Sequence, residues 1–241
     1  MQKIILGNSY KLIKEIETNS VDLVLVDPPY DIKVKQGSGA FGVKKKLNYK
    51  QLESISESFD FSILDEFVRV LKKINIYIFC SQSQVLPLLK YFVEDKGCNW
   101  TQINWCKDNV VPACNNRYAS DKETCLFFRE TGVKLYGTFK TKRTWYVTHT
   151  NVKDKRLYSH PTPKPLDIIR NLIINSTNEG DLVLDTFSGS GTTAVACKQL
   201  KRRCIAIEKE EKYFKTSIER LEATTALPVT NAEIATQQTL F

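Results

Sequence analysis

The chain has 241 residues, with hydrophobic and charged contents of 42% and 26% that are ordinary for a soluble folded protein. No segment is apolar over the about 18 residues that a membrane-spanning helix requires, and the N-terminus has no signal-peptide pattern, so we expect a cytoplasmic protein without a membrane partner. The formal net charge of +8, from 35 basic and 27 acidic residues, favours a polyanionic partner such as nucleic acid.

The first half of the chain alternates between short apolar runs and amphipathic stretches. It predicts strands at 3–6, 21–26 and 74–80, and helices at 10–18, 61–73 and 85–94, the last with Pro87 in its first turn. Residues 31–50 are rich in glycine and lysine and have no periodicity, which predicts a mobile loop that closes over a ligand.

The second half begins with predicted strands at 101–107 and 123–129, and becomes polar, aromatic and basic between 107 and 160. Regular alternation then returns, with helices expected at 165–175, 191–200 and 209–222 and strands at 181–185 and 203–208. This order predicts an α/β fold of the Rossmann-like kind, a mostly parallel sheet with helices on both faces. Residues 223–241 contain no lysine or arginine and predict a flexible tail.

The basic residues are clustered. Residues 31–50 contain six lysines and one acid, and residues 131–170 contain nine basic groups and two acids. Clusters of this kind indicate contacts with phosphates, although a solvated basic face would have the same composition.

The seven cysteines do not predict a metal site. Cys98, Cys106, Cys114 and Cys125 lack the short spacing of zinc ligands, and the chain has only two histidines. We expect reduced thiols that pack as small apolar groups, and no bound metal.

A glycine motif follows the predicted strand at 181–185. Gly189 and Gly191 open a predicted helix, and Glu208 ends the next predicted strand. Glycines allow a close backbone approach to a ligand, and a carboxylate at the next strand end suits ribose hydroxyls, so the pattern favours a nucleoside-containing cofactor over a plain tight turn. Only 50 residues follow Gly191, too few for the substrate domain of a typical NAD enzyme.

A second motif, Asp27-Pro28-Pro29-Tyr30, closes the predicted strand at 21–26. The two prolines stiffen the turn. A stiff turn aims the Asp27 carboxylate and a backbone carbonyl at the two hydrogens of an exocyclic amine, and the Tyr30 ring stacks on the base that carries it. This arrangement would position the amine nitrogen for attack on a methyl group.

The two motifs in this order resemble those of the β-class S-adenosylmethionine-dependent DNA amino-methyltransferases. A third segment, His160-Pro-Thr-Pro-Lys-Pro-Leu166, resembles the family's His-Pro-Thr-x-Lys-Pro sequence. The resemblance covers 1–222, is strong at the motifs and is weak over 107–159. It implies one circularly ordered methyltransferase domain at 1–222 with an inserted target-recognition segment at 107–159.

The resemblance also implies roles for single residues. Asp27, Pro28, Pro29 and Tyr30 would form the catalytic pocket for the target base, with S-adenosylmethionine as cofactor. The residues around its methionine part and sulfonium would be Asp185, Phe187, Ser188, Gly189, Ser190, Gly191, Thr192 and Thr193.

Four further residues would complete the cofactor site. Glu208 would bind the ribose hydroxyls, and Thr162 and Lys164 would hold the methionine carboxylate. At the adenine end relatives often carry Gly-Asp, whereas this chain has Asn8 after Gly7, so an amide replaces a carboxylate there.

The resemblance implies double-stranded DNA as the partner, a target base rotated out of the duplex and a place in restriction–modification. Candidate DNA contacts are Lys33, Lys35, Lys44, Lys45, Lys46, Arg117, Tyr118, Lys142 and Arg143, although plain surface residues would look the same.

In this family aspartate in the first motif position usually marks adenine N6 as the acceptor, and serine usually marks cytosine N4. Cytosine C5 chemistry would need a cysteine nucleophile, typically after proline, and the chain has no Pro-Cys pair. Cytosine N4, an RNA acceptor and a non-catalytic DNA-binding subunit remain as alternatives to an adenine-N6 methyltransferase.

The C-terminal residues Gln237 to Phe241 resemble a peptide that docks on a sliding clamp, although a disordered end with chance apolar residues is the plainer interpretation. Dimerisation is common among similar enzymes, so a homodimer is also considered.

Overall fold

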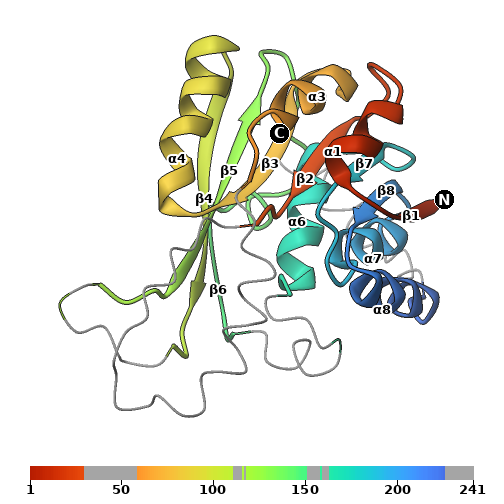
Figure 1. Cartoon of the computed structure of the whole chain (residues 1–241). Coiled ribbons are helices and arrows are strands. Elements are labelled where there is room, and N and C mark those ends of the chain that lie inside the picture. The colour runs from red at the N-terminus through yellow and green to blue at the C-terminus, as the bar shows by residue number, and fades with distance from the viewer. Residues whose placement is uncertain (30–58, 111–115, 117, 151–157, 159–162, 226–241) are drawn as a thin grey trace.

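The computed structural model describes residues 1–29, 59–110, 116, 118–150, 158 and 163–225. Eight strands form one sheet in the order β1-β8-β7-β2-β3-β5-β4-β6 (Figure 1). Their bounds are β1 Gln2–Leu6, β2 Leu23–Val26, β3 Asn75–Cys80, β4 Asn99–Lys107, β5 Lys122–Arg129, β6 Trp145–Thr148, β7 Leu182–Asp185 and β8 Arg203–Glu208.

The sheet is mostly parallel, as predicted. The run β1-β8-β7-β2-β3 is parallel throughout, so the carboxyl ends of these strands lie at one edge. Strand β5 is antiparallel to both β3 and β4, and β6 pairs in parallel with β4 at the end of the sheet. Strands buried on both faces need continuous apolar sequences, and β2 and β3 have them.

Helices cover both faces. Successive residues of β2 alternate between two cores: Val24 and Val26 contribute to one, Leu23 and Leu25 to the other. The first core contains α1, α3 and α4, and the second contains α6 and α7, with α8 packed beside α7 and β1. The bounds are α1 Ser9–Leu12, α3 Ile63–Val70, α4 Gln82–Leu89, α6 Leu166–Ser176, α7 Thr192–Gln199 and α8 Glu211–Glu222.

Three predicted helices are wrong in extent. The helix expected at 61–73 is shorter, because Leu71 is extended and forms a β-bridge with Val21. The helix expected at 10–18 ends early: α1 passes into a 3-10 turn at Ile13–Glu15, and Ile16 is extended. The Arg69 guanidinium donates to the carbonyls of Ile13 and Ile16, both at 2.9 Å, and so satisfies groups that a longer helix would have paired.

The helix expected at 85–94 starts earlier than predicted, because Ser81 and Gln84 form a capping box at its N-terminus. Pro87 therefore lies inside α4 rather than in its first turn, and the chain continues as a π-helix at Lys90–Asp95. Strand β6 was not predicted. Within the described parts of the chain, no helix is long and apolar enough to cross a membrane.

Candidate active site

Four acidic or amide side chains follow neighbouring parallel strands at the same edge of the sheet. Asp27 comes directly after β2, Asp185 ends β7, Glu208 ends β8, and Asn8 lies two residues beyond β1. Ligands of open α/β sheets bind at this edge. The two sequence motifs, 158 positions apart from Asp27 to Asp185 in the chain, therefore meet through the pairing of β2 with β7.

The loop from β7 to α7 is held in one conformation by backbone contacts. The Ser188 amide donates to the Ile207 carbonyl at 3.0 Å, and the Gly189 amide donates to the Glu208 carboxylate at 2.6 Å. Gly191 has a φ of 77°, and a Cβ atom there would lie 2.8 Å from the Ser217 Cβ. Glycine is thus required at this position both for the left-handed backbone and for the close packing of α8.

A buried arginine supports this loop from α8. The Arg220 guanidinium donates to the Ser190 carbonyl and hydroxyl, each at 3.2 Å, and to the Thr192 hydroxyl at 3.0 Å. Its Cζ atom lies 4.1 Å from the centroid of the Tyr158 ring. The hydroxyls of Ser190 and Thr192, two predicted cofactor residues, therefore accept hydrogen bonds from Arg220 and help to hold the loop in its conformation.

The buried carboxylates of Asp185 and Glu208 make this edge unfavourable for an anionic ligand. Burial raises the pKa of Asp185 to about 7, and the negative charges of Asp27 and Glu208 raise this pKa further. Hydrogen bonds from the Thr193 hydroxyl and from the Phe187 amide, the latter at 3.0 Å, lower it in part. Burial also raises the pKa of Glu208. A site with these groups favours a cationic ligand.

Two buried hydroxyls in the loop are available to pair with such a ligand. Within the described residues, Thr186 Oγ1 and Ser188 Oγ have no hydrogen-bond partner. Unsatisfied buried hydroxyls cost free energy unless a ligand or water pairs with them. Phe187 presents an aromatic edge beside Tyr10 and Phe59, with ring centroids 6.3 and 6.0 Å away. The residues present therefore fit a methyl donor with a charged methionine end.

Asn8 has a structural task as well. Its side-chain oxygen accepts from the Tyr10 amide at 2.9 Å and caps the N-terminus of α1. Asparagine and aspartate cap a helix equally well, so the departure from the family's aspartate keeps the local fold.

The turn after β2 is fixed by a residue that was not predicted. Gln84 Nε2 donates to the Pro29 carbonyl at 3.2 Å, while its side-chain oxygen accepts from the Ser81 amide at 2.8 Å. The Asp27 carboxylate forms an ion pair with Lys164, which was predicted to hold the methionine carboxylate. In the described parts of the chain, no group of three or more His, Cys, Asp or Glu could hold a metal.

A family model for DNA methylases matches residues 21–219. The chain belongs to this family. It is an S-adenosylmethionine-dependent DNA methyltransferase, and the predictions of family, fold class, enzyme class and cofactor are confirmed.

The relatives cover most of this methyltransferase. Type II methyltransferase M2.LlaDCHI of Lactococcus lactis subsp. cremoris is 31% identical over 89% of this chain and 87% of the relative. M.HpaI of Haemophilus parainfluenzae is 29% identical over 92% and 74%. The crystal structure of an M1.HpyAVI–SAM complex has a TM-score of 0.64 and 26% identity, over 92% of this chain and 100% of that one.

Three of the predicted DNA contacts lie on the surface of the methyltransferase. Tyr118, Lys142 and Arg143 are exposed. Arg143 has two aromatic neighbours that were not predicted: its Cζ atom lies 5.6 Å from the Phe139 ring centroid and 5.2 Å from that of Trp145 on β6. Phe139 and Trp145 are 82% and 50% exposed, so the three side chains form an exposed stack. We call Phe139, Arg143 and Trp145 the β6 stack.

Other predicted residues lie outside the described part of the chain. These are Tyr30, the loop 31–50 with Lys33, Lys35, Lys44, Lys45 and Lys46, Arg117, Thr162 and the tail from 226 to 241, including Gln237 to Phe241.

Sequence reasoning also missed Gln84, Glu123 and Arg220. Ser81 and Gln84 do carry the capping-box spacing, so that pattern could have been found. No local signal marks Glu123 or Arg220. Glu123 pairs with Lys164, 41 positions away, and with Lys107, 16 positions away, and Arg220 pairs with Ser190, 30 positions away.

Proposed function

We propose that this methyltransferase transfers the methyl group of S-adenosylmethionine to the N6 amine of adenine, on a base rotated out of double-stranded DNA. The observation that carries the proposal is the place of Asp27. Its carboxylate directly follows β2, which pairs with the strand that ends at Asp185, and it forms an ion pair with Lys164. An ionised carboxylate accepts hydrogen bonds and is suited to an amine donor.

Bound at the β7 loop, the cofactor supplies a methyl group on a positively charged sulfur. Asp27 and a carbonyl of the Pro28-Pro29 turn accept the two amine hydrogens, which leaves the nitrogen electron pair directed at that methyl group. With the donor bound, the nitrogen–carbon bond would form as the sulfur–carbon bond broke, and the electron pair of the broken bond would stay with the leaving sulfur. The nitrogen then carries a positive charge, and Asp27 is placed to accept the proton that it loses.

On the cofactor side we assign Asp185 and Phe187 to the sulfonium and methionine part, together with Ser188, Gly189 and Thr193. Glu208 serves the ribose hydroxyls: its oxygens accept from the amides of Gly189 and Glu210 at 2.6 and 2.8 Å, which fixes the direction of the carboxylate. Lys164, which was predicted to hold the methionine carboxylate, pairs with Asp27 and Glu123 in the structure.

The adenine assignment rests on Asp27 and has support from one relative. A DNA adenine methyltransferase of Escherichia coli, YhdJ, is 25% identical over 91% of this chain and 82% of that protein. A cytosine-N4-specific methyltransferase, PvuII, has the same fold, with a TM-score of 0.69 and 17% identity over 98% of this chain and 90% of that one. The acceptor therefore needs a direct test.

The test is to incubate the purified protein with unmethylated DNA and S-adenosylmethionine, digest the DNA and identify the modified nucleoside by mass spectrometry. We expect N6-methyladenine. N4-methylcytosine would contradict the assignment of Asp27 to adenine. No product on DNA would contradict the proposed substrate, and RNA would be assayed next.

We further propose that the β6 stack contacts DNA. Exposed aromatic rings stack on bases, and the arginine adds attraction to phosphates. Trp145→Ala is expected to weaken DNA binding about 5- to 100-fold, the effect of losing one stacking side chain. Fluorescence anisotropy with a labelled duplex measures this. Lys73→Ala is the control, because Lys73 precedes β3 at the opposite edge of the sheet and is exposed.

Three broader assignments follow the same proposal. We assign the enzyme to the modification side of a restriction–modification system in the cytoplasm, because the relatives above are Type II methyltransferases. We also propose one domain at 1–222, in which the segment 107–159 reads the target sequence. The β6 stack lies within this segment. The clamp-binding peptide at Gln237 to Phe241 and the homodimer stay predictions.

A further inference from the structure

Lys164 is a buried cation between two carboxylates, one on the turn after β2 and one on β5. Its side chain is 6% exposed, and its Nζ atom pairs with Asp27 and with Glu123 Oε2, the latter at 3.1 Å. The same atom lies 5.0 Å from the centroid of the Phe79 ring. Burying an ammonium is costly unless it is paired. Here the pairing has two partners, and only one of them belongs to the catalytic motif.

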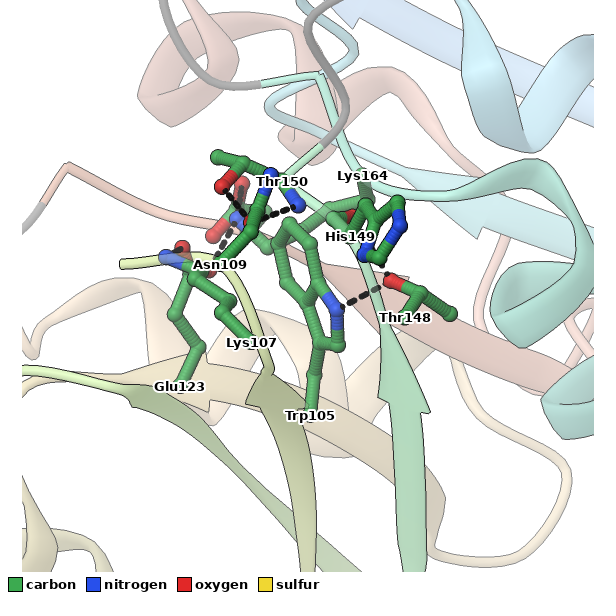
Figure 2. Close-up of polar contacts among 9 residues, drawn as sticks. Trp105, Lys107, Asn109, Glu123, Thr148, His149, Thr150 and Lys164 are labelled. Atoms are coloured by element: carbon green, nitrogen blue, oxygen red, sulfur yellow. Dashed lines mark hydrogen bonds and ion pairs between the residues drawn. The ribbon is translucent and has the colours of Figure 1, made fainter. Parts of the chain in front are cut away.

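Glu123 comes from the start of β5, on the face that packs against Lys164. It lies opposite Trp105 of β4 in the antiparallel register, so Lys107, two residues along β4, shares its face. Lys107 Nζ pairs with Glu123 Oε1 at 2.5 Å and lies 4.7 Å from the Trp105 ring centroid. The two oxygens of Glu123 thus hold two different lysines, as Figure 2 shows for Lys107, Glu123 and Lys164.

Strand β4, which carries Lys107, is held in place by hydrogen bonds to β6 and to the residues that follow it. Trp105 Nε1 donates to the Thr148 hydroxyl at 2.8 Å, which joins β4 to β6 (Figure 2). Beyond the strands, Asn109 Oδ1 accepts from the Thr150 amide at 2.7 Å. Glu123 lies on β5, which pairs with β4, and β4 is in turn linked to β6, so Glu123 has a fixed position. Asp27, in contrast, lies on the turn after β2.

We propose that Glu123 is a positioning residue: it shares the Lys164 ammonium with Asp27, and thereby sets the direction of the Asp27 carboxylate. The inference rests on the proposed function, because Asp27 is the amine acceptor there. The four side chains alternate in sign from Lys107 through Glu123 and Lys164 to Asp27, so each charge has an opposite neighbour.

Without Glu123, Lys164 would have Asp27 as its one carboxylate partner among these four side chains. The pair would then compete directly with the target amine for the Asp27 oxygens. Sharing the ammonium weakens that competition and leaves Asp27 able to accept from the amine. Glu123 also keeps Lys164 charged: burial by itself lowers the pKa of Lys164, but the charges of Asp27 and Glu123 outweigh burial and raise it.

Other titratable groups face this cluster. They are Cys80 at the end of β3, Cys125 on β5 and Asp185 on β7, each coupled electrostatically to Asp27. Burial raises the pKa of both thiols, and Asp185 titrates near neutral pH. A change at alkaline pH therefore reports on Lys164 rather than on Asp185.

The first test does not depend on turnover. The Nζ resonance of Lys164 is followed by NMR against pH in the wild-type protein and in Glu123→Gln, with Lys164→Arg used to assign it. We expect a lower pKa of Lys164 in Glu123→Gln, because one of its two counter-charges is gone. An unchanged pKa of Lys164 would overturn the proposal.

The second test uses single-turnover methylation of DNA. Glu123→Gln is expected to lower the rate about 100-fold, the order of loss when a reacting group is misplaced, with little change in KM for DNA. The alkaline limb of its pH–rate profile should move to lower pH, and Glu123→Asp should recover part of the rate. Glu94→Gln is the control, since Glu94 is exposed on the π-helix at Lys90–Asp95 and the substitution changes the charge equally.

Equal losses in Glu123→Gln and Glu94→Gln, or a wild-type pH profile in Glu123→Gln, would overturn the positioning role. A wild-type protein that methylates no adenine would contradict the proposed function instead, and the NMR titration would still decide the Glu123–Lys164 contact. If Glu123→Gln fails to fold, the double variant Lys107→Gln with Glu123→Gln keeps the net charge and removes the same contact.

Discussion

Asp27→Ala is expected to abolish methyl transfer while S-adenosylmethionine still binds. The carboxylate accepts a hydrogen bond from the amine and takes its proton, and removing a group of this kind costs about 10²- to 10⁴-fold in rate. The cofactor loop is supported by Glu208 and Arg220, which do not depend on Asp27. Single-turnover rates and calorimetric binding of the cofactor measure the two effects separately.

The fold should survive this substitution, because Lys164 retains Glu123 as a partner. Asp22 provides a matched control near the other end of the same strand, where it pairs with Lys72 at 2.6 Å and accepts from the Leu182 amide at 2.9 Å. Asp22→Asn keeps an acceptor for that amide and should methylate DNA at the wild-type rate. Turnover retained in Asp27→Ala would contradict the catalytic role of Asp27.

The parts of the fold that follow from local chemistry could be predicted. Continuous apolar runs identified β2 and β7, and the glycines at 189 and 191 identified the turn into α7, where the φ of Gly191 and its approach to Ser217 require glycine. Because parallel strands end at one edge, the motifs at Asp27 and Asp185 were expected at one site, and the pairing of β2 with β7 places them there.

The parts that depend on distant partners could not be predicted. The sequence at 10–18 is helical in pattern, but Arg69 satisfies the carbonyls of Ile13 and Ile16 and ends the helix. Strand β6 is short and exposed, and pairing with β4 rather than an apolar pattern defines it. Lys164 was assigned through its motif alone, and its contacts with Asp27 and Glu123 arise only when β2, β5 and α6 are assembled.

S-adenosylmethionine is expected to bind more tightly as the pH rises through neutrality. The buried Asp185 carboxyl has a pKa raised to about 7, so about half of the molecules carry it protonated at that pH. The donor's sulfonium and ammonium favour the ionised form, and binding therefore releases a proton. The dissociation constant should fall about tenfold between pH 6 and pH 8, the change in the ionised fraction of a group with this pKa.

Isothermal titration calorimetry in two buffers with different ionisation enthalpies measures both the affinity and the proton release. Asp185→Asn is the matched variant, because it keeps the size of the side chain and leaves the ligand's own titration unchanged. At pH 8 its affinity should be about 10- to 100-fold weaker than that of the wild-type protein, the range for a hydrogen bond to a charged group. Equal pH dependence in both proteins would contradict the assignment of the proton to Asp185.

The same carboxyl should destabilise the protein without its cofactor at higher pH. A folded-state pKa above the unfolded value means that the folded protein binds the proton more strongly, so stability falls as pH rises from about 4 to about 7. Asp185→Asn should therefore melt at a higher temperature than the wild-type protein at pH 8, and the difference should shrink at pH 5. Asp185 thus lowers the stability of the free protein and raises its affinity for the cofactor. Such a group indicates a ligand site, because the positive charge of the bound donor compensates the unfavourable burial of the carboxylate.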